Sequence, residues 1–176
     1  MLHTTEQHAS ASPIARRRLG GDRYRDQVIA LVAKQGFQVS DGTREQDMKE
    51  ASDLLLDGQG CALRIRAEKA LQRWPDEFTI RARRPECGAD TEFRKIMDGH
   101  ARYALYGFTD GKDQVVLMRL LDLDVLRTCL LACSRQDNLA KYDRNLRTGE
   151  DGVGYLVFNI REFPPTLVRF AWDYRH

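Results

Sequence analysis

Two stretches in which apolar and polar residues alternate constrain the fold of this chain more than any other feature. In residues 61–67 every second side chain is apolar, and Arg64 and Arg66 lie between the apolar positions. Residues 77–83 alternate in the same way, with Arg81 and Arg83 on the polar side. An alternation of period two is typical of a strand with one face on the core and one face in water. We therefore predict two strands of one sheet whose arginines share a solvent-exposed face.

The first alternating strand is expected to belong to a hairpin. Residues 52–56 form an apolar run, and residues 57–60 separate it from the strand at 61–67, which is a hairpin pattern. With a four-residue turn, Asp53 falls opposite Arg64. Directly opposed residues have Cβ atoms about 5 Å apart. We expect these two side chains to form an ion pair.

Residues 77–83 are expected to join this hairpin as a third, antiparallel strand. The polar face of the sheet would then carry four arginines around the single carboxylate of Asp53. These arginines are Arg64, Arg66, Arg81 and Arg83.

The rest of the chain predicts further helices and strands around this sheet. Apolar residues at helical spacing predict a helix within 22–35, followed by a short strand at 37–39. Later elements are expected at these places: a helix from Asp90 or Thr91 to Met97, strands at 103–108 and 115–121, a helix capped by Asp122 or Asp124, and a strand at 155–160. The order predicts an α/β (α+β) fold with a mixed central sheet and flanking helices. We expect residues 1–20 to be a flexible basic arm and residues 21–176 to form one domain.

Composition excludes several classes of protein. The formal net charge is +2, so the whole molecule is not a polycation. No apolar run approaches the roughly 18–20 residues that cross a membrane, and residues 1–12 lack the apolar segment of a secretory signal. The four cysteines form no CxxC pair, and we expect reduced thiols rather than a zinc site. These features favour a cytoplasmic protein without a membrane partner.

Positive charge is concentrated in one segment. Residues 61–84 hold seven basic and three acidic side chains, a local charge of +4. Such a face suits phosphate, because the planar guanidinium group can donate two hydrogen bonds to it. Trp74 and Tyr103 are candidate surfaces for stacking unpaired bases. The alternative is that the arginines are the solvated side of an amphipathic sheet, paired with nearby carboxylates.

The order of a helix, a short strand, a strand carrying Asp53, a turn and a further strand resembles the PD-(D/E)XK, or restriction-endonuclease-like, superfamily. The resemblance covers roughly residues 22–121. The chain is also similar to small uncharacterised bacteriophage proteins. The stretches that carry this likeness include Asp47-Met48, Ala51-Ser52-Asp53, Leu63-Arg64-Ile65-Arg66, Glu77-Phe78-Thr79-Ile80-Arg81, Thr91-Glu92, Tyr106-Gly107 and Leu121-Asp122-Leu123-Asp124.

The resemblance implies a metal site. Members of the superfamily hold Mg²⁺ between an Asp and a second carboxylate, with a Lys beside the attacking water. Asp53 matches the first carboxylate and is the expected metal ligand. The next strand has Arg64-Ile65-Arg66 where a carboxylate, one residue and a lysine are expected. Glu68 and Lys69, two residues further on, are the candidate replacements with catalytic roles.

Other carboxylates are alternative second ligands. They are Asp22, Asp26, Asp47, Glu50 and Glu92.

Two functions follow as hypotheses. The first is a nucleic-acid-binding protein of phage type, for DNA or RNA, on a nuclease-like scaffold, as a degenerate or a Mg²⁺-dependent nuclease. The second is a non-catalytic phage protein that binds and inhibits a host complex active in defence or nucleic-acid processing.

Overall fold

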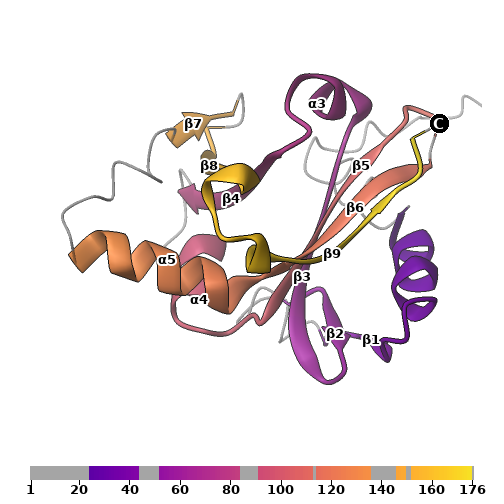
Figure 1. Cartoon of the computed structure of the whole chain (residues 1–176), viewed down its shortest axis with the longest axis horizontal. Coiled ribbons are helices and arrows are strands. Elements are labelled where there is room, and N and C mark those ends of the chain that lie inside the picture. Colours follow the sequence, from indigo (N-terminus) through magenta and orange to yellow (C-terminus); the bar gives the residue numbers. More distant parts are fainter. Residues whose placement is uncertain are drawn as a thin grey trace, which may run out of the picture.

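The described part of the chain has a mixed α+β fold built on two β-sheets (Figure 1). The computed structural model describes residues 24–43, 52–83, 91–112, 114–135, 146–149 and 152–175. The predicted basic arm at 1–20 lies outside these ranges. The predicted mixed central sheet is confirmed.

The larger sheet has six strands in the order β1-β2-β3-β5-β6-β9. Strand β3 runs parallel to β5, and the other neighbours in this sheet pair antiparallel. A parallel pair needs a crossover connection, and that connection contains helix α4 (Glu92–Met97). The strands are β1 (Val39–Asp41), β2 (Leu54–Leu56), β3 (Gln59–Arg66), β5 (Tyr103–Thr109), β6 (Val115–Asp122) and β9 (Val168–Asp173).

The smaller sheet has three strands in the order β4-β8-β7, and both of its pairs are antiparallel. Its strands are β4 (Glu77–Arg83), β8 (Gly154–Asn159) and β7 (Leu146–Thr148). Helix α3 (Glu68–Arg73) connects β3 to β4, and α5 (Leu123–Arg135) follows β6. Two short 3-10 turns, η2 (Ile160–Glu162) and η3 (Pro165–Leu167), precede β9.

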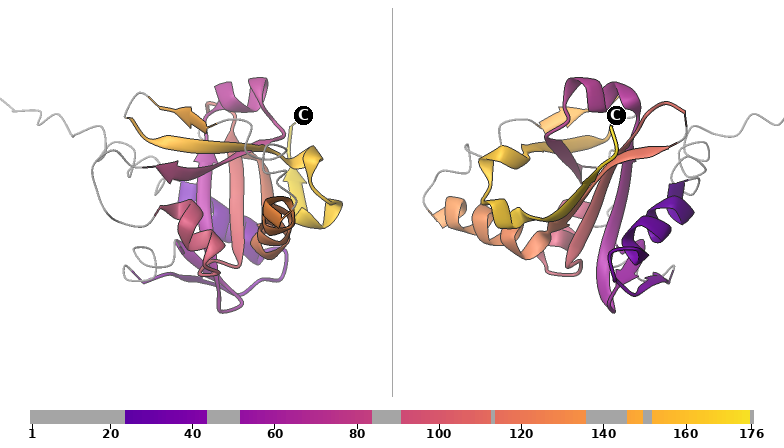
Figure 2. Two further views of the ribbon diagram at one scale, coloured as in Figure 1. Left: turned by 90° about the vertical axis from the view of Figure 1, so that its left-hand side faces the viewer. Right: turned by 45° about the vertical axis from the view of Figure 1, so that its right-hand side comes forward.

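Both faces of the larger sheet are covered (Figure 2). Residues 24–33 are helical and pack on one face, where Val28 meets a core that includes Leu105. On the other face α4, α5 and the smaller sheet enclose a second core, which includes Tyr106 and Phe108. Successive residues of β5 therefore serve opposite cores, as the alternation of a strand requires.

Several predicted boundaries are confirmed by local contacts. The hydroxyl of Thr91 accepts a hydrogen bond from the amide of Arg94, so Thr91 caps α4. The carboxylate of Asp122 accepts hydrogen bonds from the amides of Asp124 and Val125 at the start of α5. Side-chain caps of this kind satisfy amides that the first helical turn leaves without a partner.

The prediction that residues 77–83 join the hairpin is wrong. Strand β4 pairs with β8 in the smaller sheet. Strand β3 pairs with β5 along residues 61–66 on one side and with β2 at residues 59–61 on the other, and β4 joins neither side. Phe78 instead stacks on Phe158 with ring centroids 5.2 Å apart, which helps hold β4 against β8.

The predicted register of the hairpin is also wrong. The turn is the two-residue Asp57-Gly58, with φ angles of 50° and 76°, and Leu54 lies opposite Cys61. Positive φ at both central residues is typical of the tight type I′ hairpin. Continuing this register places Asp53 opposite Ala62, two positions from Arg64.

The expected solvent exposure of the arginine face is not found either. Arg64 and Arg66 share their face of the larger sheet with Tyr106, and β4 and α4 cover this face. The polar alternation of β3 therefore marks a polar region between two layers. A polar side of a strand can be buried when other polar groups satisfy it.

Three of the four cysteines lie in the described ranges. Cys61, Cys129 and Cys133 are free thiols. Burial raises the pKa of the Cys61 thiol. In the same ranges no helix has the length and apolar character needed to cross a membrane.

Replacing Leu105 by Ala tests the core between the sheet and the helix at 24–33. Leu105 is fully buried, and truncating such a residue removes apolar contacts and leaves a cavity. We expect the free energy of unfolding to fall by about 2–5 kcal/mol in urea denaturation. Leu131→Ala is the control, because Leu131 is 49% exposed and its truncation should change stability by only about 0.5 kcal/mol. Equal losses in the two variants would contradict this placement of the core.

Candidate functional site

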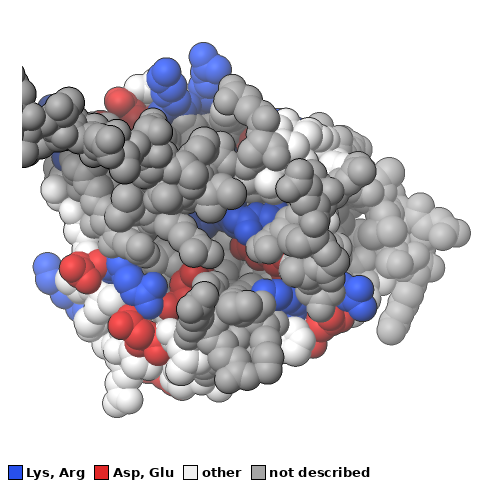
Figure 3. All heavy atoms as spheres, turned by 180° about the vertical axis from the view of Figure 1, so that it is seen from behind, with Lys and Arg blue, Asp and Glu red and all other residues white. Residues whose placement is uncertain are grey.

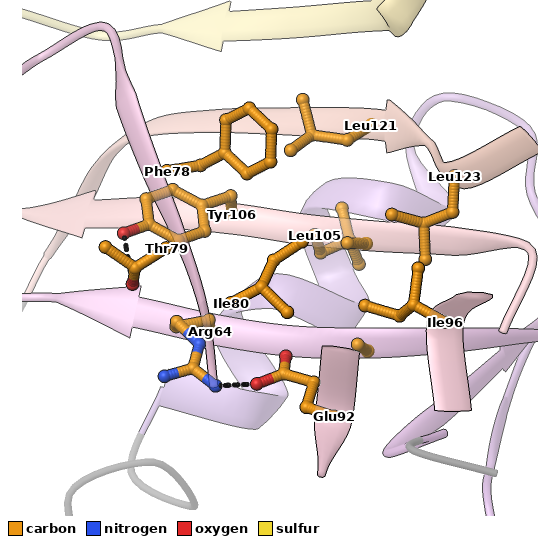
Figure 4. Close-up of a pocket in the computed structure, with 12 residues that line it drawn as sticks. Arg64, Phe78, Thr79, Ile80, Glu92, Ile96, Leu105, Tyr106, Leu121 and Leu123 are labelled. Atoms are coloured by element: carbon orange, nitrogen blue, oxygen red, sulfur yellow. Dashed lines mark hydrogen bonds and ion pairs between the residues drawn. The ribbon is translucent and has the colours of Figure 1, made fainter. Parts of the chain in front are cut away.

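Three arginines meet where β3 and β4 approach the start of α4. We call Arg64, Arg66 and Arg81 the arginine cluster. Figure 3 shows basic and acidic side chains next to one another on the back face of the molecule. Figure 4 shows Arg64 and Glu92 in contact at one end of a pocket, with apolar side chains at the other end.

Glu92 is the anion of this site. Its Oε2 accepts hydrogen bonds from the Nη2 atom of Arg64 and, at 3.1 Å, from the backbone amide of Arg81. The side chains of Arg64 and Glu92 are 22% and 15% exposed, so the pair is largely shielded from water. Burial lowers the pKa of Arg64, but the charge of Glu92 and other neighbours outweighs burial and the net shift is upward. Arg64 therefore stays a cation in a shielded position.

Arg66 is held by neutral groups. Its Nη1 atom donates to Oγ1 of Thr79 at 3.0 Å and to the hydroxyl of Tyr106 at 3.3 Å. The two hydroxyls also lie 3.3 Å apart and form a hydrogen bond with each other. Among the described residues, Arg66 has no carboxylate partner. Its charge is oriented but not neutralised.

Arg81 adds a third guanidinium group. Its Nε atom is buried and has no hydrogen-bond partner among the residues that the structure describes. An unmet buried donor costs about 1–3 kcal/mol. The cluster thus contains a hydrogen-bond donor without an acceptor.

The pocket beside the cluster is small. It has a volume of about 10 Å³, enough for about one water molecule. Most of its wall is apolar, including Phe78, Ile96 and Leu121. A ligand larger than water must therefore meet the arginines at the outer side of the cluster.

Asp53 lies on the hairpin next to this site. Its Oδ2 atom accepts a hydrogen bond from the amide of Leu63 at 2.7 Å, and its carbonyl oxygen accepts one from Arg25 at 2.7 Å. The predicted ion pair with Arg64 is not formed, because the register differs and Glu92 takes that guanidinium. Asp53 is still close enough to contribute to the raised pKa of Arg64.

The structure separates the other predicted catalytic residues from Asp53. Glu68 opens α3 beyond the end of β3, and its Oε1 atom accepts a hydrogen bond from Gln72. The carboxylate of Glu68 lies against the turn between β5 and β6, because a Cβ at Gly111 would lie 2.5 Å from its Oε2 atom. Strand residues rise about 3.3 Å each, so Glu68 lies well away from Leu63 and Asp53. Lys69 is exposed next to Glu68.

The remaining sequence candidates are placed as follows. Arg83 ends β4, and its side chain is not among those described. Asp26 is exposed on the helix at 24–33. The candidates Asp22, Asp47 and Glu50 lie outside the described residues.

The carboxylates of the site do not fit a magnesium ion. In the described ranges no group of three or more His, Cys, Asp or Glu side chains is arranged to hold a metal. The cationic side chain of Arg64 contacts Glu92 and would repel a divalent cation there. Among the described residues the geometry therefore provides an arginine site and no set of ligands for the metal that the resemblance implies.

Sequence reasoning missed the neutral partners of the cluster. The hydroxyls of Thr79 and Tyr106 orient Arg66, and Glu92 acts as a counter-ion from α4. Thr91-Glu92 was visible as the start of a helix. Its approach to β3 depends on the crossover between two parallel strands, which the alternation of single strands does not reveal.

Comparisons with protein-family models, curated proteins and solved structures find no match for this chain. The functional argument therefore depends on the site itself.

A double-mutant cycle tests whether Glu92 stabilises the fold through Arg64. Glu92→Gln removes the charge and keeps an oxygen that accepts from the Arg81 amide. We expect this variant to lose about 1.5–3 kcal/mol of unfolding free energy, because Arg64 is left without a counter-charge. Denaturant unfolding measures the loss.

The second arm of the cycle replaces Arg64 by Met, alone and together with Glu92→Gln. The double variant should be more stable than the sum of the single losses indicates, with a coupling of about 1–2 kcal/mol. Additive losses would show that the ion pair contributes nothing measurable.

Proposed function

We propose that this chain binds nucleic acid through phosphate contacts made by the arginine cluster on a nuclease-like scaffold. The observation that carries the proposal is the imbalance of charge at the site. Of the three arginines, only Arg64 pairs its guanidinium group with a carboxylate, that of Glu92, which also accepts a hydrogen bond from the backbone amide of Arg81. Arg66 is held by two hydroxyls instead. Arginine's planar set of donors can bind two oxygens of a phosphate as it binds a carboxylate, and phosphate is the anion that nucleic acid presents.

Arg66 is the member of the cluster best prepared for a phosphate. Its described hydrogen bonds use Nη1 and go to two hydroxyls. The Nε and Nη2 groups remain able to donate to a pair of phosphate oxygens. Since Thr79 and Tyr106 already fix the orientation of the side chain, binding costs little side-chain entropy.

The order of elements supports the scaffold part of the proposal. A helix at 24–33, the short strand β1, Asp53 immediately before β2, a tight turn and β3 follow one another as in the restriction-endonuclease-like pattern. The arginine cluster lies on β3 and its neighbours, next to Asp53. We infer that the scaffold is kept and that arginines replace the metal-binding groups.

The alternative, a phage protein that inhibits a host complex, remains a hypothesis for the same surface. An arginine site that accepts phosphate also suits an acidic protein surface. The two functions differ in whether purified nucleic acid alone is bound.

Arg66→Met tests phosphate binding, because methionine keeps much of the apolar stem and removes the charge. We expect affinity for short fluorescein-labelled DNA or RNA to fall about tenfold at low salt, the loss of one charge-assisted hydrogen-bonded contact. The slope of log K against log salt should become shallower by about one unit. Fluorescence anisotropy across a salt series measures both quantities.

Arg169→Met is the matched control. Arg169 is exposed on β9, away from β3 and β4 in the sheet order, and its removal should leave affinity nearly unchanged. Wild-type protein that fails to bind DNA or RNA at low salt would contradict the proposal and favour the protein-binding alternative.

The misfit of the site to magnesium predicts binding without hydrolysis. With Mg²⁺ or Mn²⁺ added, labelled DNA and RNA should remain full length on denaturing gels, for the wild type and for Asp53→Ala alike. Cleavage by the wild type that Asp53→Ala abolishes would restore the nuclease interpretation and identify Asp53 as a metal ligand.

A further inference from the structure

We infer that the nucleic acid is a single strand, whose unpaired bases stack along a row of arginines and aromatic rings leading from the arginine cluster to Trp74. This inference rests on the proposed function and names its substrate class. The row consists of Arg64, Tyr155, Arg147 and Trp74, and we call it the arginine–aromatic row.

The pairing of strands in the smaller sheet places the middle residues of the row side by side. Arg81 of β4 lies opposite Tyr155 of β8, and Tyr155 lies opposite Arg147 of β7. Directly opposed residues in antiparallel strands project from the same face of a sheet. One face of the smaller sheet therefore carries an arginine, a tyrosine and an arginine side by side.

Contacts at both ends extend this line. The guanidinium carbon of Arg64 lies 5.9 Å from the centroid of the Tyr155 ring, which joins the row to the arginine cluster. At the other end the guanidinium carbon of Arg147 lies 5.5 Å from the centroid of the Trp74 ring. Arg73 contacts the same ring at 5.9 Å. Charged and aromatic groups thus alternate over three strands and the end of α3.

Trp74 presents a partly exposed ring at a fixed place. Trp74 is 38% exposed. Its backbone amide donates to the carbonyl oxygen of Ala70 at 2.8 Å, so the end of α3 fixes the main chain. In Figures 1 and 2, α3 lies at the same end of the molecule as β7 and β8.

Arg73 and Arg147, which contact the Trp74 ring, can leave that ring and bind a phosphate instead. Arg147 is 46% exposed and lies 3.4 Å from Glu77, and Arg73 is exposed at the end of α3. When a base covers the ring, each arginine can donate to the phosphate beside that base. Base stacking combined with phosphate contacts is the usual way in which proteins hold single strands.

Base pairing determines whether the bases of a nucleic acid can reach the aromatic rings of the row. In a duplex the faces of the bases are stacked on each other and only edges and phosphates are reachable. A row of aromatic rings is used only by unpaired bases. We therefore expect single-stranded nucleic acid to bind more tightly than a duplex of the same length.

Tryptophan fluorescence tests the inference directly. The chain has two tryptophans, and Trp172 is buried at 7% exposure. A thymidine oligonucleotide of about 12 nucleotides is the probe, a length within the usual site size for single strands. We expect the oligonucleotide to quench the fluorescence of Trp74, and Trp74→Phe to abolish that quenching.

Affinity measurements separate stacking from charge. Trp74→Ala should weaken binding of the thymidine oligonucleotide about tenfold and leave duplex binding unchanged, because one stacked base contributes about 1–3 kcal/mol. Trp74→Phe should keep most of the affinity, since it retains an aromatic face. Tyr174→Ala is the matched control, because Tyr174 is 44% exposed after β9 and outside the row.

The outcomes distinguish this inference from the proposed function. If Arg66→Met weakens binding but Trp74→Ala does not, the stacking row is refuted and phosphate binding stands. Equal loss on single strand and duplex with Trp74→Ala also refutes stacking. If the wild type binds neither form, both proposals fail together.

Discussion

The junction between the two sheets depends on one carboxylate. Glu92 begins α4 and contacts the guanidinium group of Arg64 on β3. It also accepts a hydrogen bond from the backbone amide of Arg81 on β4. Three elements that are distant in sequence are thereby joined at one oxygen atom, Oε2 of Glu92. Removing a charged pair from water costs free energy, and additional hydrogen bonds to the pair offset part of that cost. The amide of Arg81 supplies that extra bond here.

This arrangement leaves the site with more positive than negative charge. The carboxylate of Glu92 neutralises the charge of Arg64, whereas two hydroxyls orient Arg66 without neutralising its charge. If the polar groups served only to hold the layers together, a second carboxylate or an apolar side chain in place of Arg66 would do so at lower cost. The phosphate ligand of the proposed function would balance this charge.

The sequence predicts the separate elements better than their association. The cap at Thr91, the cap at Asp122 and the strands around Asp110-Gly111 depend on contacts between near neighbours, and these predictions are confirmed. The partner of β4 depends on which edges remain free after β3 pairs with β5, which no local pattern contains. For the same reason Asp53 was assigned to Arg64, whereas the counter-ion comes from α4. The arginines themselves were predictable, because their alternation is visible in the chain.

The buried Nε group of Arg81 links stability to binding. Among the described residues this donor has no acceptor, which lowers the stability of the folded chain by about 1–3 kcal/mol. A phosphate oxygen that reached this part of the cluster would supply the missing acceptor. A ligand that binds only the folded state also stabilises it. Under the proposed function, the same group that lowers the stability of the free protein would therefore stabilise the complex with phosphate.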